Sequence, residues 1–134
     1  MTAHPHFLST DHVLAIHERL IGEFGGDPSV CDHGLLESAV RLPRATFDGE
    51  LLHGSLGEMA GAYLFHLCMN HPFVDGNKRT ALAAAEVFLL VNSVKFVATD
   101  EELYELTIGV AASRTSKSDV AEFFKEHIAK TPAE

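Results

Sequence analysis

The sequence predicts an all-α fold, a compact bundle of about six helices with a short flap ahead of the two central helices. Three observations support this class. Apolar side chains recur three and four positions apart over most of the chain, which is the spacing of one face of an α-helix. Most of these stretches open on a Ser, Thr or Asp that can cap a helix. Only residues 94–98 have the pattern of an extended segment.

The first two helices have clear start and stop signals. Ser9-Thr10 supplies capping candidates for a helix that ends at Gly25-Gly26. Asp32 can cap a second helix, and Pro43 ends it because proline cannot continue the backbone hydrogen bonds. Residues 44–54 have no helical period and contain two glycines, so we expect an exposed loop or flap there.

Four more helices follow the flap. Ser55 begins a capping-box spacing and an amphipathic stretch, which residues 70–76 interrupt. Residues 77–91 are apolar almost all round, as expected of a central helix. Thr99 and Ser116 are capping candidates for the last two helices.

Size and composition indicate one ordinary folded domain. We expect it to cover residues 1–134, with its core at about residues 11–128. The N-terminus lacks the pattern of a leader, and the most apolar stretch, residues 81–91, is too short to cross a membrane. Cys31 and Cys68 have no partner at CxxC spacing, which argues against a zinc knuckle and favours a reducing, cytoplasmic location.

The charge balance is acidic. Ten basic and 19 acidic side chains give a formal net charge of −9. Such a surface repels a phosphate backbone, so direct binding of nucleic acid is not expected. An anionic ligand would need a local positive site, which directs attention to the few basic clusters.

One such cluster lies in the loop that opens the fourth helix. The first-turn N–H groups of a helix lack intrahelical acceptors and favour anions. Gly76 permits close approach of a ligand, and the Lys78 and Arg79 side chains add positive charge. We therefore expect a phosphate cradle formed by Gly76, Asn77, Lys78 and Arg79.

The same loop carries groups suited to chemistry. His71 has the side chain whose ordinary pKa suits proton abstraction near neutrality. Asp75 is a hard oxygen ligand, as a Mg²⁺ ion that bridges phosphates requires. Phe73 is expected to anchor the loop in the core. A base, a metal carboxylate and a phosphate cradle within ten residues predict phosphoryl or nucleotidyl transfer.

The segment His71–Arg79, HPFVDGNKR, also resembles the HxFx(D/E)GN(G/K)R signature of the Fic/Doc superfamily, which it matches at every defined position. Other segments look like Doc-type chains, so the resemblance covers most of residues 11–128. These segments are Gly25-Gly26, residues 32–39, Thr80-Ala81-Leu82 and Phe88-Leu89. The resemblance implies a helical transferase with ATP and Mg²⁺ as cofactors, His71 as general base and Asp75 as metal ligand.

Two positions differ from the nucleotidyl-transferring Fic pattern. Lys78 stands where that pattern has Gly, and Leu82 stands where it has a second Arg. Doc proteins share both differences. The resemblance therefore implies a protein kinase toxin that transfers the ATP γ-phosphate to a threonine of elongation factor Tu and blocks translation. It also implies that the flap, near residues 45–50, docks the target as an added strand.

The resemblance has a consequence for regulation as well. Many Fic enzymes carry an inhibitory (S/T)xxxE(G/N) helix, but no Glu in this sequence is followed by Gly or Asn. An enzyme without that internal brake needs control in trans. We therefore expect a separate antitoxin that resembles Phd.

Two other functions remain open. One is a Fic-type adenylyltransferase that uses His71 and Asp75 to transfer AMP. The other is a catalytically silent interaction module. In the latter, His71 would be a capping or loop histidine, Asp75 and Asn77 would be turn or helix-cap residues, and Lys78-Arg79 would be an exposed basic pair.

Two further groups of residues have simple structural interpretations. The chain has nine histidines, but none forms an i, i+4 ligand pair beside the motif, so surface or solvated side chains are expected. Glu86, alone on an apolar helix, is expected to face solvent.

Overall fold

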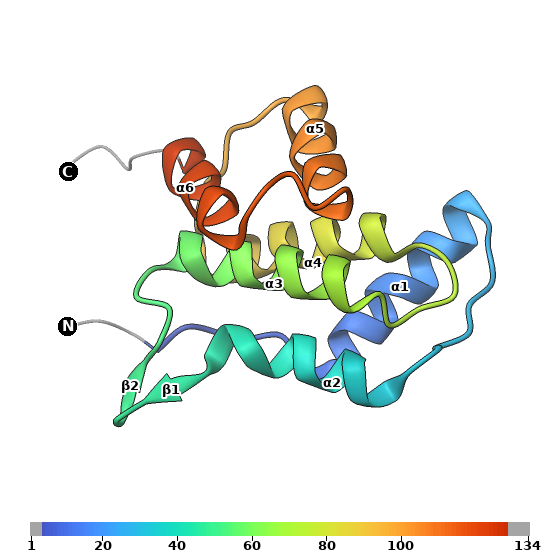
Figure 1. Ribbon diagram of the computed structural model, residues 1–134, viewed down its shortest axis with the longest axis horizontal. Helices are drawn as coiled ribbons and strands as arrows, with labels where there is room; N and C mark the ends of the chain where they lie inside the picture. The colour runs from blue at the N-terminus through green and yellow to red at the C-terminus, as the bar shows by residue number, and fades with distance from the viewer. Residues whose placement is uncertain (1–3, 129–134) are drawn as a thin grey trace.

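A computed structural model describes residues 4–128, and within that range the chain forms six α-helices, a 3₁₀ turn and a two-stranded hairpin (Figure 1). The elements in chain order are α1 (Thr10–Phe24), α2 (His33–Arg41), η1 (Leu42–Arg44), β1 (Thr46–Phe47), β2 (Glu50–Leu51), α3 (Leu56–Asn70), α4 (Asn77–Val91), α5 (Asp100–Ala111) and α6 (Lys117–His127). The predicted all-α class and the six helices are confirmed.

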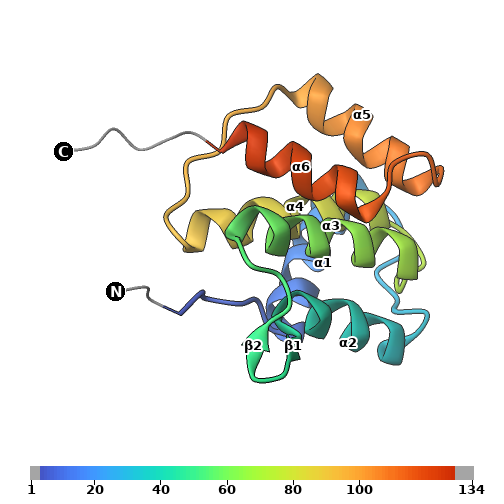
Figure 2. The same ribbon diagram turned by 60° about the vertical axis from the view of Figure 1, so that its left-hand side comes forward.

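Helices α3 and α4 form the centre of the bundle. A six-residue loop joins them, so they run antiparallel to each other. Helices α5 and α6 cover one side of this pair, and α1, α2 and the hairpin lie on the other side, as both views show (Figures 1 and 2). The loop between α3 and α4 therefore lies at one end of the bundle, and the hairpin lies at the other.

Helix α3 is buried along most of its length because neighbours contact it on several sides. Eight of the largest side chains with almost no exposure come from four helices and from the α3–α4 loop: Tyr63, Phe73, Phe88, Phe124, Leu36, Leu64, Leu67 and Leu89. Two glycines let α6 approach α3 closely. A Cβ built on Gly61 would lie 3.2 Å from the Cα and N of Ala121, and one built on Gly57 would lie 3.2 Å from the N of Lys125.

The helix starts agree with the capping signals in the sequence. In five helices the predicted residue accepts a hydrogen bond from a first-turn backbone N–H: Ser9, Asp32, Ser55, Thr99 and Ser116. Helix α4 is the exception among the described helices. Its N-cap is Gly76, which has no side chain to offer.

The flap is more ordered than expected. Within the predicted loop, β1 and β2 pair in antiparallel register, with Thr46 opposite Leu51. Asp48 (φ 54°) and Gly49 (φ 83°) make the turn, and positive φ at both central residues matches the twist of a hairpin. The expectation of an extended segment at residues 94–98 is met only by an isolated bridge between Phe96 and Ile128.

The expectation that the histidines lie at the surface is wrong for three of them. His17 is 2% exposed and His53 is 7% exposed. His66 is half-buried, and burial lowers its pKa to about 4, with a further contribution from the charges of Lys117 and His53. Packing of α1, the flap and α6 against the central pair encloses these side chains.

Cys31 and Cys68 are both free thiols, and no helix among residues 4–128 has the length and apolarity to cross a membrane.

Candidate active site

The predicted motif forms the loop between α3 and α4. His71 caps the C-terminus of α3 in a left-handed conformation (φ 50°, ψ 54°), and its side chain is exposed. Gly76 precedes α4, also in the left-handed region (φ 80°, ψ 17°). The first position is uncommon for a residue with a Cβ, whereas the second suits glycine. The loop is therefore bounded by two left-handed residues that reverse the chain.

Phe73 and Asn77 fix the shape of this loop. The Phe73 ring is 1% exposed, which confirms its predicted role as an anchor. The Asn77 side chain closes the loop, since Oδ1 accepts from the N–H of Phe73 (3.0 Å) and Nδ2 donates to the carbonyl of Phe73 (2.8 Å). Nδ2 also lies 3.2 Å from each ring nitrogen of His71. Asn77 therefore holds both the loop and the imidazole, a role that the sequence did not indicate.

A second segment, residues 26–32, supports the loop from behind. The carbonyl of Pro72 accepts from the N–H groups of Cys31 (2.7 Å) and Asp32 (3.2 Å), and the N–H of Val74 donates to the carbonyl of Ser29 (3.1 Å). The loop is therefore bonded on its inner side through its backbone, as a short strand would be. This arrangement leaves the outer side for the functional groups.

Asp75 lies at the exposed tip of the loop. Its Oδ2 accepts from the N–H of Asp27 (2.8 Å), and its backbone carbonyl accepts from Nε2 of His17 (2.8 Å). Gly26 comes so close that a Cβ there would lie 3.1 Å from the Cβ of Asp75. Asp75 does not cap α4, because the N-cap is Gly76. The alternative of a local helix cap is therefore wrong for this residue.

The start of α4 presents unpaired donors. Among residues 4–128, no acceptor is hydrogen-bonded to the backbone N–H groups of residues 76–79, and the first such bond of α4 runs from Thr80 to Gly76. The left-handed Gly76 followed by helical Asn77 forms a concave backbone nest, which is an arrangement that binds anions. The positive end of the helix dipole points to the same place. The backbone at the start of α4 therefore has the geometry that a phosphate cradle requires, and phosphate binding there stays a prediction.

A cavity of about 690 Å³ opens beside this helix start. It is lined by Gly76, by Asn77, Lys78, Arg79 and Leu82 of α4, by Phe24 of α1, and by Leu103, Tyr104, Thr107 and Ile108 of α5. Arg79 is held above the Phe24 ring, with Cζ 4.2 Å from the ring centroid, in a cation–π contact. The cavity therefore has a basic end near the motif and an apolar wall from α5.

Two carboxylates, Glu86 and Asp100, line the same cavity. Burial raises the pKa of Glu86, and the charge of Asp100 raises it further. The side chain is nevertheless exposed by surface area, in agreement with the prediction that it faces solvent. Asp75 has no partner carboxylate in a metal cluster, since the described residues contain no group of three His, Cys, Asp or Glu side chains placed to hold an ion.

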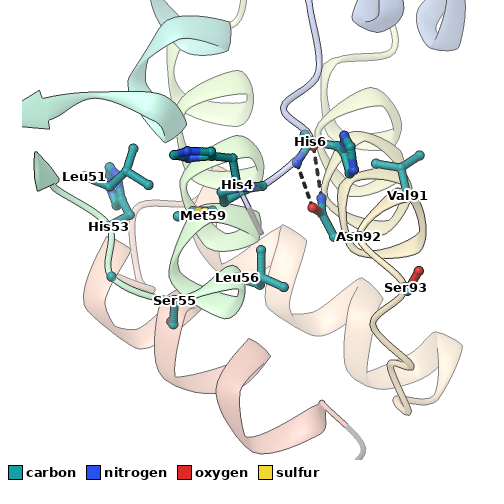
Figure 3. Close-up of a pocket in the computed structure, with 12 residues that line it drawn as sticks. His4, His6, Leu51, His53, Ser55, Leu56, Met59, Val91, Asn92 and Ser93 are labelled. Carbon is teal, nitrogen blue, oxygen red and sulfur yellow. Dashed lines mark hydrogen bonds between the residues drawn. The ribbon is translucent and has the colours of Figure 1, made fainter. Parts of the chain in front are cut away.

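A second cavity, of about 640 Å³, lies at the opposite end of α3 and α4 (Figure 3). The start of α3, the end of α4 and the N-terminal segment enclose it, with His4, His6 and His53 at its edge. The backbone of His6 and the side chain of Asn92 exchange two hydrogen bonds, of 2.8 and 3.0 Å, which tie the N-terminal segment to α4 (Figure 3). No motif residue lines this cavity.

The structure therefore brings together all six predicted site residues at one end of the bundle: His71, Asp75, Gly76, Asn77, Lys78 and Arg79. The sequence did not indicate His17 or Asp27, which contact Asp75 from 58 and 48 positions away. An exposed histidine, an exposed carboxylate and a nest of backbone donors therefore lie together beside a cavity with a basic end, which is an arrangement typical of sites for anionic ligands.

The chain belongs to the Fic/DOC family, whose profile matches residues 7–89, from the segment before α1 through most of α4. It is similar to Protein kinase doc of Escherichia phage P1, with 36% identity over 115 residues that cover 86% of this chain and 90% of that protein. It is also similar to Toxin Doc of Mycolicibacterium smegmatis, with 49% identity over 75 residues. That second alignment covers 56% of this chain and 58% of the relative's length. The Doc-type resemblance inferred from the motif is confirmed.

Proposed function

We propose that this protein is a toxin of the Doc type, a kinase that transfers the γ-phosphate of ATP to a hydroxyl of another protein. The observation that carries the proposal is the start of α4, where four successive backbone N–H groups have no acceptor among the described residues. Lys78 and Arg79 extend this nest into a cavity whose volume can hold a nucleotide. The similarity to a protein named as a kinase supports phosphate as the transferred group.

His71 acts as the general base in this proposal. Its imidazole accepts the proton of the target hydroxyl, and the hydroxyl oxygen bonds to the γ-phosphorus. The bond from that phosphorus to the β–γ bridging oxygen breaks, and ADP leaves with the electron pair. Asn77 Nδ2 lies 3.2 Å from each ring nitrogen, so its amide packs against the imidazole and limits the positions that the ring can take. The nest and Lys78 stabilise charge on the phosphate oxygens.

Asp75 would hold Mg²⁺ together with the nucleotide. A single exposed carboxylate fits this role, because Mg²⁺ in nucleotide sites is typically held by one or two carboxylates, substrate phosphates and water. The ion would neutralise phosphate charge when bound. Oδ2 of Asp75 already accepts a hydrogen bond from Asp27, and this bond fixes the carboxylate at the loop tip.

The target and the regulator follow from the family likeness. The target we expect is elongation factor Tu, modified on a threonine, with the hairpin β1–β2 presenting the target strand. The hairpin suits this role because both strands are exposed and Phe47 is 77% exposed at its edge. The regulator we expect is a separate antitoxin similar to Phd.

The experiment that tests the proposal compares two radiolabels. Purified wild-type protein is incubated with a bacterial translation extract and ATP labelled at the γ- or the α-phosphate. We expect γ-label on one protein of the extract, dependent on Mg²⁺. The His71→Ala variant should lose about 10²–10⁴-fold in rate, whereas His33→Ala, at an exposed histidine of α2, should retain it.

The outcomes separate the candidate functions. Label from the α-position would show adenylyl transfer in place of phosphate transfer. Absence of both labels, with the extract's elongation factor Tu present and intact, would contradict the proposed enzyme. Mass spectrometry of the labelled protein identifies the target and the modified hydroxyl.

A further inference from the structure

His17 is a buried histidine outside the motif that contacts the motif directly. It comes from the middle of α1 and is 2% exposed. Its ring stacks on the Phe73 ring, with centroids 3.7 Å apart and an interplanar angle of 7°. Its Nε2 lies 2.8 Å from the carbonyl oxygen of Asp75, so that nitrogen carries the proton and donates.

The acceptor of that bond belongs to the peptide that joins Asp75 to Gly76. In a trans peptide the carbonyl and the N–H point in opposite directions. Because His17 draws the Asp75 carbonyl towards the buried side of the loop, the N–H of Gly76 points away from His17. This N–H is the first of the four unpaired donors at the start of α4. The orientation of one peptide therefore decides whether the nest begins with a donor or with a carbonyl oxygen.

Gly76 makes this peptide easy to rotate. Without a Cβ, glycine adopts positive and negative φ at similar cost, so a rotation of the 75–76 peptide has little steric opposition. The rotated peptide would present the Asp75 carbonyl to the anion site and repel phosphate. Helix α1 packs closely against Gly76, since a Cβ built there would lie 3.3 Å from Ile21 and 3.6 Å from His17. The hydrogen bond is the contact that distinguishes the two orientations.

We propose that His17 is a positioning residue that locks the Asp75–Gly76 peptide in the orientation that binds phosphate. This inference rests on the proposed function, because it assigns a residue to the same phosphate site. His17 acts through the backbone and does not touch the ligand. Its role should therefore be carried by its N–H and be separable from its packing.

Two matched variants isolate the N–H. His17→Gln keeps a side-chain N–H donor at similar reach, and His17→Met has nearly the same length and shape but no donor. Both lose the stack on Phe73, so they should share its cost in stability. A purely structural role predicts that Met performs at least as well as Gln, because Met is the better core residue. A role of the His17 N–H in holding the peptide predicts instead that Gln performs better than Met.

The first measurement uses the free protein. In ¹⁵N-labelled full-length protein, the amide of Gly76 reports the peptide orientation through its three-bond coupling, and relaxation dispersion reports exchange between orientations. We expect one orientation in wild type and His17→Gln, and exchange in His17→Met. A single unchanged orientation in His17→Met would overturn the lock.

The second measurement is ATP binding with Mg²⁺, by titration calorimetry. We expect His17→Gln to bind within about threefold of wild type and His17→Met to bind about tenfold more weakly, which corresponds to about 1.4 kcal/mol. Equal affinity in the two variants would overturn the inference. Absence of ATP binding by the wild type would contradict the proposed function instead, because the lock is measured in the free protein.

Discussion

At the scale of single residues, Asp75 has a structural contact and a proposed chemical role in the same side chain. One carboxylate oxygen accepts from the backbone of Asp27, and the segment around Asp27 supports the loop. Loss of the side chain could therefore disturb Mg²⁺ binding, loop position or both. Only a substitution that keeps the acceptor and removes the charge separates the two roles.

Asp75→Asn and Asp75→Ala make that separation. The Asn side chain can still accept from Asp27, so the melting temperature of Asp75→Asn should stay within about 2 °C of wild type. Asp75→Ala frees an exposed N–H that water can satisfy, so this variant should lose about 0.5–1.5 kcal/mol of unfolding free energy. Both should weaken Mg²⁺-dependent ATP binding by at least about tenfold, because Mg²⁺ depends on charged oxygen ligands. Calorimetric titration with and without Mg²⁺ measures this. Unchanged ATP·Mg binding by Asp75→Asn would remove Asp75 from the metal site.

The motif residues could be predicted because they are contiguous. His71 to Arg79 form one loop and one helix start, so local rules on caps, nests and ligand types apply directly. His17 could not be predicted in the same way. At its position in α1 it follows the spacing of an inward-facing residue, but its partner is 58 positions away. Only the packing of α1 on the loop reveals it.

At the scale of elements, the capped helices were predictable and the hairpin was missed. The strands β1 and β2 have two residues each and are exposed on both faces, so they show no alternation of apolar and polar residues. Asp48-Gly49 was the available signal, because Asp-Gly favours the tight turn of a hairpin. Turn chemistry therefore indicates this element better than hydrophobic pattern does.

Replacement of glycine by alanine should have opposite effects at an open position in α1 and at the close contact between α3 and α6. Gly22 lies within α1 and has nothing within 4 Å of a built Cβ, so Gly22→Ala should stabilise by about 0.5–1 kcal/mol through helix propensity. Gly61→Ala places its methyl 3.2 Å from the backbone of Ala121 and should destabilise by about 1–3 kcal/mol. Urea unfolding of both variants measures the difference. Stabilisation by Gly61→Ala would show that α6 is free to move away from α3.

At the scale of the whole molecule, the site depends on elements beyond the motif. The family profile covers residues 7–89, which include α1, the loop and most of α4. Helix α5 lies outside that match but supplies the apolar wall of the cavity, with Leu103 and Tyr104 among its residues. The sequence predicted both central helices and α5, but not which face of α5 would close the cavity. That choice depends on how α5 and α6 pack together on the central pair.

The bundle also encloses a basic cluster away from the site, formed by His53, His66 and Lys117. Burial, together with the smaller effects of the charges of Lys117 and His53, lowers the pKa of His66 to about 4. Burial and Lys117 also lower the pKa of His53, while Glu58 opposes that shift. No acceptor or donor among residues 4–128 is bonded to the buried Nε2 of His66. The folded state therefore favours the neutral imidazole.

This preference fixes the sign of a pH effect on stability. In the unfolded chain His66 has an ordinary pKa near 6.5, so between about pH 6.5 and pH 4 the unfolded state binds more protons than the folded state. The stability is complete above that range and falls as the pH decreases through it. We expect a loss on the order of 2 kcal/mol, reduced from the full shift because His66 is only half-buried. Urea unfolding of wild type at pH 7 and pH 4.5 measures it.

The variants assign the effect to its residue. His66→Gln cannot be protonated in this range, so its unfolding free energy should fall less between pH 7 and pH 4.5 than that of wild type. His33→Gln changes an exposed histidine at the start of α2 and should keep the wild-type pH dependence. An equal fall in wild type and His66→Gln would show that the acid sensitivity arises elsewhere. If the prediction holds, adding His53→Gln to His66→Gln should reduce the loss of unfolding free energy between pH 7 and pH 4.5 still further, because burial also lowers the pKa of His53.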